Sequence, residues 1–266
     1  MERRPCRPFT LCAKTTWTPD WARTLLSLCR FVLPVVVRFP ATASTNQLRV
    51  PQPQSFFDTV GACEGAESAM LKALIFAAMV DLLSPSVQVR SYLREPVHDA
   101  ELRYDAIADD ISTILSDETE PLLFTGPAGR EATGLLLATI AWHESGFRKD
   151  VDTCTGALSR GDNGRSVGLL QVMRGPNYEG HTAKEICGDR RLAIRLGLHV
   201  LNRAKETCQR MSPRGWVQSF VAGYCGWDTF SARSVCAAFQ RVGQKWLNGA
   251  SCASAGPVTL REASPS

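Results

Sequence analysis

Hydrophobic residues recur at helical spacing from about residue 100 onward and predict a mainly helical domain. In the first helix the apolar positions form one face below acidic outward positions, and they are Leu102, Ala106, Ile107, Ile111, Ile114 and Leu115. Comparable spacing predicts further helices over 131–146, 189–208, 214–224 and 230–247. We expect Asp99 to cap the start of the first helix and Gly146 to end the second.

A different pattern follows the second predicted helix. Residues 147–167 show no periodicity and are rich in Gly, Asp, Ser and Thr, which predicts a long loop or a small β-excursion. The stretch Gly161–Met173 then combines a Gly-rich turn with a short apolar strand or helix start. The predicted fold class is therefore mainly α, with helices arranged around one Gly/Asp-rich loop that gives it an α+β character.

The N-terminal segment lacks these periodic patterns. Seven prolines interrupt its first 60 residues, so we predict that it is poorly ordered. The apolar run Leu25–Val37 contains Arg30 and Pro34 and is too short to span a membrane, which takes ~20 apolar residues. The run has features of an atypical signal peptide; alternatively, translation begins at Met70, where a cleaner apolar segment starts.

These patterns divide the chain into four segments. They are an N-terminal extension over 1–69, a linker or helical segment over 70–98, the helical domain over 99–249, and a disordered tail over 250–266. The formal net charge of +4 is spread as a mosaic, with +6 over 1–50, −9 over 51–127 and +7 over 128–247. Nucleic-acid-binding proteins concentrate Lys and Arg on one element, so this mosaic argues against a nucleic-acid partner.

Six of the ten cysteines lie in the second half of the chain, at Cys154, Cys187, Cys208, Cys225, Cys236 and Cys252. No pair has the CxxC spacing of a zinc site, and we expect neither a metal nor a cofactor. The six residues either form up to three disulfides in an oxidising compartment or are buried thiols. The sequence leaves both alternatives open.

Glu144 is the first candidate for chemistry, because it ends an apolar helix directly before the Ser145-Gly146 stop. A carboxylate at a helix C-terminus faces the negative end of the helix dipole, and the indole of Trp142 lowers the local dielectric. Both effects raise the pKa of a carboxyl group toward the range that suits a general acid near neutral pH.

Two later segments add groups that suit a ligand. The glycines of Gly161–Met173 let the backbone approach a ligand closely, and the Gln171 amide offers both a donor and an acceptor to sugar groups. Further on, Tyr224 stands at a predicted helix end and supplies an apolar face with one hydroxyl.

Three short motifs, in this order, resemble the signature of the lytic transglycosylases (SLT-type) and goose-type lysozymes. They are Glu144-Ser145, Gly168-Leu-Leu-Gln171 and Gly223-Tyr224, and the resemblance covers about 130–228. It implies a lysozyme-like helical domain that cleaves the β-1,4 bond between N-acetylmuramic acid and N-acetylglucosamine in peptidoglycan. Glu144 would be the general acid and later the base, and Ser145 would orient it.

The same resemblance implies that the glycan contacts a set formed by Ser145, Gly168, Leu169, Gln171, Met173 and Tyr224. Two features bear on the mechanism. The family's Asn after the Tyr is Cys225 here, and Asp162 in Gly161-Asp162 matches the acidic residue of the goose-type pattern. We therefore expect a lytic transglycosylase that needs only Glu144, with an inverting muramidase that uses Glu144 and Asp162 as the alternative.

Peptidoglycan strands are the expected partner, and the positive charge of 128–247 would attract the free carboxylates of their peptide stems. The expected location is the periplasm, the cell envelope or the outside of the cell, with association to a phage tail, a secretion apparatus or a conjugation apparatus. A non-catalytic glycan-binding module or a virion structural module is the alternative from another class.

Overall fold

The computed structural model describes residues 55–84, 95–156, 159, 161–211, 229–248 and 258–260. The chain divides into two compact units, and the described residues lie almost entirely in the second, Glu64–Arg261. The expectations for residues 1–54 and for a helix over 214–224 lie outside the described residues.

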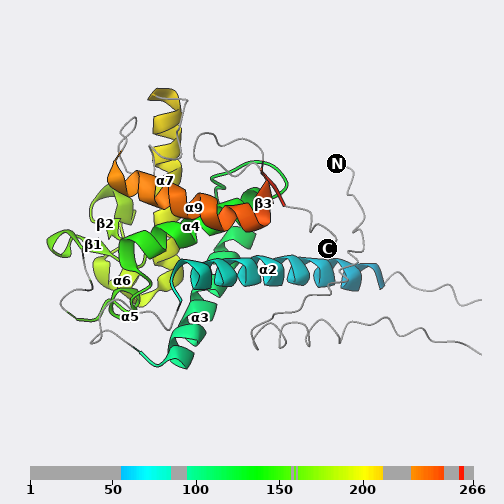
Figure 1. Cartoon of the computed structure of the whole chain (residues 1–266), viewed down its shortest axis with the longest axis horizontal. Coiled ribbons are helices and arrows are strands. Elements are labelled where there is room, and N and C mark those ends of the chain that lie inside the picture. Colours follow the sequence, from blue (N-terminus) through cyan, green and yellow to red (C-terminus); the bar gives the residue numbers. More distant parts are fainter. Residues whose placement is uncertain are drawn as a thin grey trace, which may run out of the picture. The chain divides into compact units, whose positions relative to one another are not determined.

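The described elements are mainly helices, as predicted (Figure 1). In chain order they are α2 (Ser55–Leu82), α3 (Val97–Ser116), α4 (Gly129–Ser145), α5 (Lys149–Asp152), the 3₁₀ turn η2 (Asp162–Gly164), β1 (Ser166–Val167), β2 (Val172–Met173), the 3₁₀ turn η3 (Pro176–Tyr178), α6 (Ala183–Gly188), α7 (Arg190–Met211), α9 (Phe230–Trp246), β3 (Leu247–Asn248) and β4 (Thr259–Leu260).

Helix α4 is the centre of the main core. It is apolar around almost its whole circumference, and every residue from Ala132 to Ala141 is buried. A helix that is hydrophobic on all sides is surrounded by other elements, and α4 packs against α3 and α9, which crosses it in Figure 1. Gly134 lets α2 pack closely, because an added Cβ would lie 2.9 Å from Ile75 Cδ1 and that side chain would have to shift.

Helix α3 is close to its prediction but differs in two details. Its buried face includes Tyr104, Ile107, Ile111 and Ile114, whereas Leu102, which we expected on that face, is 58% exposed. The helix begins earlier than expected, at Val97, so Asp99 lies within the first turn and makes no side-chain cap. Its carboxylate there still faces the positive end of the helix dipole.

The region after α4 contains the small β-excursion. Strands β1 and β2 form an antiparallel pair in which Ser166 is opposite Met173 and Val167 is opposite Val172. A second small core lies beneath this hairpin, formed by Val167, Val172, Tyr178, Ile186, Ala193 and Leu196. The hairpin is thus fixed by apolar contacts with η3, α6 and the start of α7.

Two segments extend the core beyond the range 99–249. Residues 70–82, expected as a linker or a helical segment, belong to α2, and buried Leu71, Ile75 and Met79 join the main core. Part of the tail that we expected to be disordered forms β4, which pairs with β3. The reason is Val258, which is buried and exchanges backbone hydrogen bonds with Thr125 and Ala128.

Among the described helices, none is long and apolar enough to cross a membrane.

Candidate functional site

The last turn of α4 presents Glu144 at the surface, directly after the buried stretch of the helix that ends at Ala141. Gly146 ends the helix in the left-handed conformation (φ 59°), as the sequence predicted. The buried hydroxyl of Ser145 donates to the carbonyl of Ala141 at 2.5 Å and accepts the N–H of Phe147 at 3.3 Å. Ser145 therefore fixes the backbone of the turn, and its hydrogen bonds go to the main chain.

The carboxyl group of Glu144 has a raised pKa. Desolvation by the surrounding protein is the largest cause, the charge of His143 opposes it, and the charge of Asp162 adds to it. The direction agrees with the sequence prediction, although the structure adds a carboxylate that is 18 positions away in the chain. The residue is exposed to solvent, so its proton is accessible to a ligand.

Asp162 lies in a turn of unusual backbone. Asp162, Asn163 and Gly164 all have positive φ, at 49°, 57° and 86°, a region that costs most non-glycine residues about 1 kcal/mol or more. The exposed Asp162 side chain is held through Oδ2, which accepts the hydroxyl of Ser166 at 2.8 Å. The turn thus places this carboxylate close enough to influence Glu144.

Gln171 fixes the turn from the opposite side. Its Oε1 accepts the N–H of Gly161 at 2.8 Å, and its Nε2 donates to the carbonyl of Gly168 at 2.8 Å. An added Cβ on Gly161 would collide with Oε1 of Gln171. The amide therefore has a structural task that the sequence did not reveal, and it keeps one N–H and one lone pair for a ligand.

The remaining predicted contact residues differ in exposure. Met173 is 46% exposed on β2, whereas Leu169 is 2% exposed and belongs to the main core. Gly168 is buried with φ 75°, and an added Cβ there would lie 3.2 Å from Cβ of Ala193. Leu169 and Gly168 therefore shape the site from beneath without a side-chain surface of their own. Tyr224 and Cys225 lie outside the described residues.

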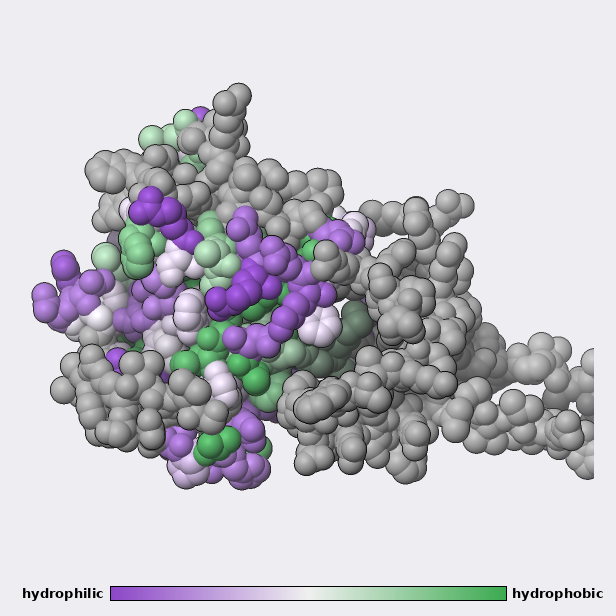
Figure 2. All heavy atoms as spheres, viewed as in Figure 1, coloured by the Kyte–Doolittle hydropathy of each residue, from purple (hydrophilic) through white to green (hydrophobic). Residues whose placement is uncertain are grey.

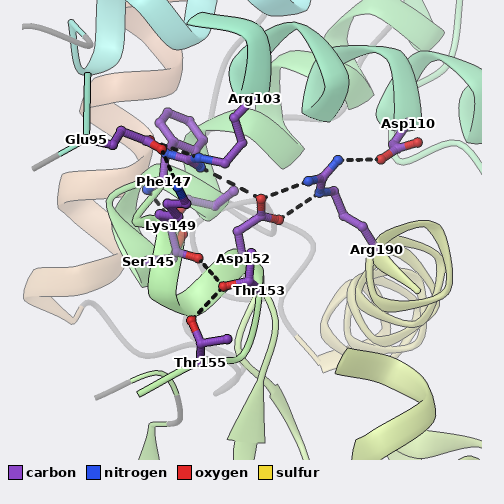
Figure 3. Close-up of polar contacts among 11 residues, drawn as sticks. Glu95, Arg103, Asp110, Ser145, Phe147, Lys149, Asp152, Thr153, Thr155 and Arg190 are labelled. Carbon is purple, nitrogen blue, oxygen red and sulfur yellow. Dashed lines mark hydrogen bonds and ion pairs between the residues drawn. The ribbon is translucent and has the colours of Figure 1, made fainter. Parts of the chain in front are cut away.

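The sequence did not reveal how the loop that carries Asp162 and Gln171 is closed. Cys154 and Cys187 form a disulfide across a separation of 33 residues. Next to it, Arg190 contacts the fully buried carboxylate of Asp152 through two hydrogen bonds of 2.7 and 2.8 Å (Figure 3). We name these four residues the loop base.

Further charges surround the loop base. Arg190 also donates to Asp110 at 2.9 Å, and Arg103 lies 3.8 Å from Asp152 while it pairs with buried Glu95. Figure 3 shows these side chains pointing toward one another from α3, α5 and α7. Cys208 and Cys236 are disulfide-bonded as well, so the disulfide alternative applies to at least four of the six C-terminal cysteines.

Within the described parts of the chain, no group of three or more His, Cys, Asp and Glu residues is arranged to hold a metal ion. Comparison with known proteins found no matching family model, no matching curated protein and no matching solved structure.

Proposed function

We propose that the chain is a lytic transglycosylase that cleaves the β-1,4 bond between N-acetylmuramic acid and N-acetylglucosamine in peptidoglycan. The observation that carries the proposal is the state of Glu144, an exposed carboxyl group whose pKa is raised by desolvation and by Asp162. Both features suit a general acid, because a raised pKa favours the protonated form of the carboxyl group and exposure lets it reach a substrate.

In this mechanism Glu144 acts twice. Its carboxyl group first gives a proton to the glycosidic oxygen, as the bond between this oxygen and C1 of N-acetylmuramic acid breaks. The resulting carboxylate then takes the proton of the 6-hydroxyl of the same sugar. The oxygen of this hydroxyl attacks C1 and closes a 1,6-anhydro ring. The proton balance is complete with one protein carboxyl group, and no water is consumed.

The surrounding residues take supporting roles in this proposal. Ser145 fixes the turn that carries Glu144, and Gln171 fixes the turn that carries Asp162. Exposed Met173 offers an apolar contact to a sugar ring. Tyr224 is proposed as a substrate contact from the sequence resemblance alone.

An inverting hydrolase is the second candidate, and the position of Asp162 favours it. Its charge acts on Glu144, and its Oδ2 accepts a hydrogen bond from Ser166 while Oδ1 has no partner among the described residues. An inverting hydrolase uses such a second carboxylate to activate water. In that case Asp162 would be the base and the product would carry a reducing end.

The test is a mass analysis of the fragments that the protein releases from purified peptidoglycan. We expect 1,6-anhydromuramic acid ends, and we expect Asp162→Asn to lower the rate less than about tenfold, since a turn residue contributes ~1 kcal/mol. Reducing ends together with a collapse of activity in Asp162→Asn would move the assignment to the hydrolase. Absence of any cleavage with retained glycan binding would support a non-catalytic module.

The proposed substrate also fixes the proposed location. An enzyme that acts on peptidoglycan meets it in the periplasm and cell envelope, or from outside the cell. Association with a phage tail, a secretion apparatus or a conjugation apparatus belongs to the same proposal, because each of these must open the wall locally.

A further inference from the structure

Most charged side chains around the site have a partner. The arginines that contact a carboxylate within 4 Å are Arg103, Arg148, Arg190, Arg191, Arg195 and Arg203. Arg165 and Arg174 differ from them. Both are exposed, both lie beside the β1–β2 hairpin, and neither pairs with a carboxylate among the described residues.

The backbone holds these two arginines next to each other. Their positions continue the hairpin register one step beyond Ser166 and Met173, and the N–H of Arg174 donates to the carbonyl of Arg165 at 2.7 Å. The guanidinium of Arg165 is tied to the turn, because its Nε donates to the carbonyl oxygen of Asp162 at 3.2 Å. Arg165 therefore extends from the same turn that presents Asp162.

Two exposed arginines that are neighbours along the backbone and have no carboxylate partner among the described residues offer hydrogen-bond donors to an anionic ligand, whereas Asp and Glu pair with arginines elsewhere in the same unit. A carboxylate suits guanidinium groups because it accepts two parallel hydrogen bonds. Figure 2 shows hydrophilic and apolar side chains side by side where Figure 1 labels β1 and β2.

We propose that Arg165 and Arg174 form a subsite for the carboxylates of the peptide stem that branches from the glycan strand. This inference rests on the proposed function, since it assigns the pair to a part of the same substrate. Arg165 is bonded to the turn of Asp162 and Arg174 follows β2, while the charges that shift the pKa of Glu144 are those of His143 and Asp162. The subsite therefore sets substrate preference, and the proton transfer stays with Glu144.

The experiment compares the double variant Arg165→Gln/Arg174→Gln with the full-length wild-type chain on two substrates. One is intact peptidoglycan, and the other is the same glycan after an amidase has removed its peptide stems. Arg241→Gln is the matched control, because Arg241 is an exposed α9 arginine without a carboxylate partner in the described residues. Folding is checked by comparing thermal midpoints.

We expect the wild type to prefer the stem-bearing glycan in kcat/KM by about fivefold, as two exposed ion pairs allow. The double variant should lose this preference through a higher KM, and the control should keep it. The preference should also weaken at high salt, because exposed charges are screened. The pH profile of kcat should be the same in all three proteins.

Three other outcomes have separate meanings. Equal cleavage of both substrates by wild type and double variant would overturn the subsite and leave the proposed function standing. An unrelated polyanion, such as DNA, is added as a competitor at equal total charge. If it abolishes the preference, the proposed subsite would also be overturned. Cleavage of neither substrate would contradict the proposed function itself.

Discussion

The two ends of the loop between α5 and α6 are built in different ways. The loop base joins Cys154 to Cys187 covalently and Asp152 to Arg190 through a buried ion pair. The tip, Gly161–Gly164, is mostly exposed and is held by hydrogen bonds alone: the Gly161 N–H donates to Gln171, and Ser166 and Arg165 donate to Asp162. The carboxylate of the base, Asp152, is buried, whereas the carboxylate of the tip, Asp162, is exposed.

This difference shows how an exposed side chain such as Asp162 can also be held in a defined position. Strong links at the loop base restrict the whole loop, so the tip can keep its geometry through hydrogen bonds alone. Changes at the base should therefore act mainly on the free energy of unfolding. Changes at the tip should act mainly on activity.

The largest effect on stability is expected from Cys154→Ala/Cys187→Ala. A disulfide that closes a loop of 33 residues stabilises by about 3.5 kcal/mol through the entropy of the unfolded chain, or roughly 10 °C in Tm. Calorimetry of variant and wild type measures the difference. An unchanged Tm would show that the loop base does not restrict the loop.

Asp152→Asn is expected to have the second-largest effect on stability. It leaves Arg190 and Arg103 facing a neutral group at a site where the Asp152 side chain is 0% exposed, so we expect a loss of about 2–3 kcal/mol. The control is Asp105→Asn, because the Lys72–Asp105 pair is largely exposed and should contribute under ~1 kcal/mol. Equal losses of Tm in the two variants would contradict the importance of burial here.

Gly161→Ala should separate activity from stability. The added methyl collides with Oε1 of Gln171 and breaks the hydrogen bond from the Gly161 N–H, at a local cost of about 1–2 kcal/mol. We expect peptidoglycan cleavage to fall about tenfold while Tm falls by only about 3–6 °C, less than in the disulfide variant. Gly188→Ala is the control, because nothing lies within 4 Å of its Cβ position; identical activity in both variants would show that the turn is adaptable.

The smallest effect concerns the stability of Glu144→Gln as a function of pH. Because the folded-state pKa of Glu144 is raised, its contribution to stability is fully present below the unfolded-state pKa and is lost as pH rises through the folded-state value. At pH 7 the amide should therefore be as stable as the wild type or slightly more stable. In acid the unfolding free energies of wild type and variant should coincide. A variant less stable than wild type at pH 7 would contradict the expected sign of the difference.

Helices α3 and α4 could be predicted from sequence, α3 because it buries one periodic face and α4 because it is apolar along its length and is followed by Gly146. Helix α4 ends at Gly146 as expected, and Ile107, Ile111 and Ile114 of α3 are buried as their spacing indicated. Helix α6 was missed although a signal was present, since Thr182 and Glu185 form a capping box at its start. Six residues are too few for a periodic pattern.

The contacts of the site were less predictable, because they join distant positions. Asp152 and Arg190 are 38 residues apart, and no local pattern indicates that this aspartate is buried while Asp162 is exposed. The amide of Gln171 was expected to face a ligand, but half of its hydrogen-bonding capacity serves the backbone of Gly161 and Gly168. A single sequence records which residues are polar, and only the fold determines which polar groups they meet.

The most direct test of the account compares three proteins on intact peptidoglycan: wild type, Glu144→Gln and Glu131→Gln. Glu131 is a matched control, because it lies on the same helix and its pKa is also raised by desolvation. Released fragments are identified by mass. We expect anhydromuramic products from wild type and Glu131→Gln, and a rate at least ~10²-fold lower from Glu144→Gln. Cleavage by a folded Glu144→Gln at the wild-type rate would contradict the assignment of Glu144 as the acid.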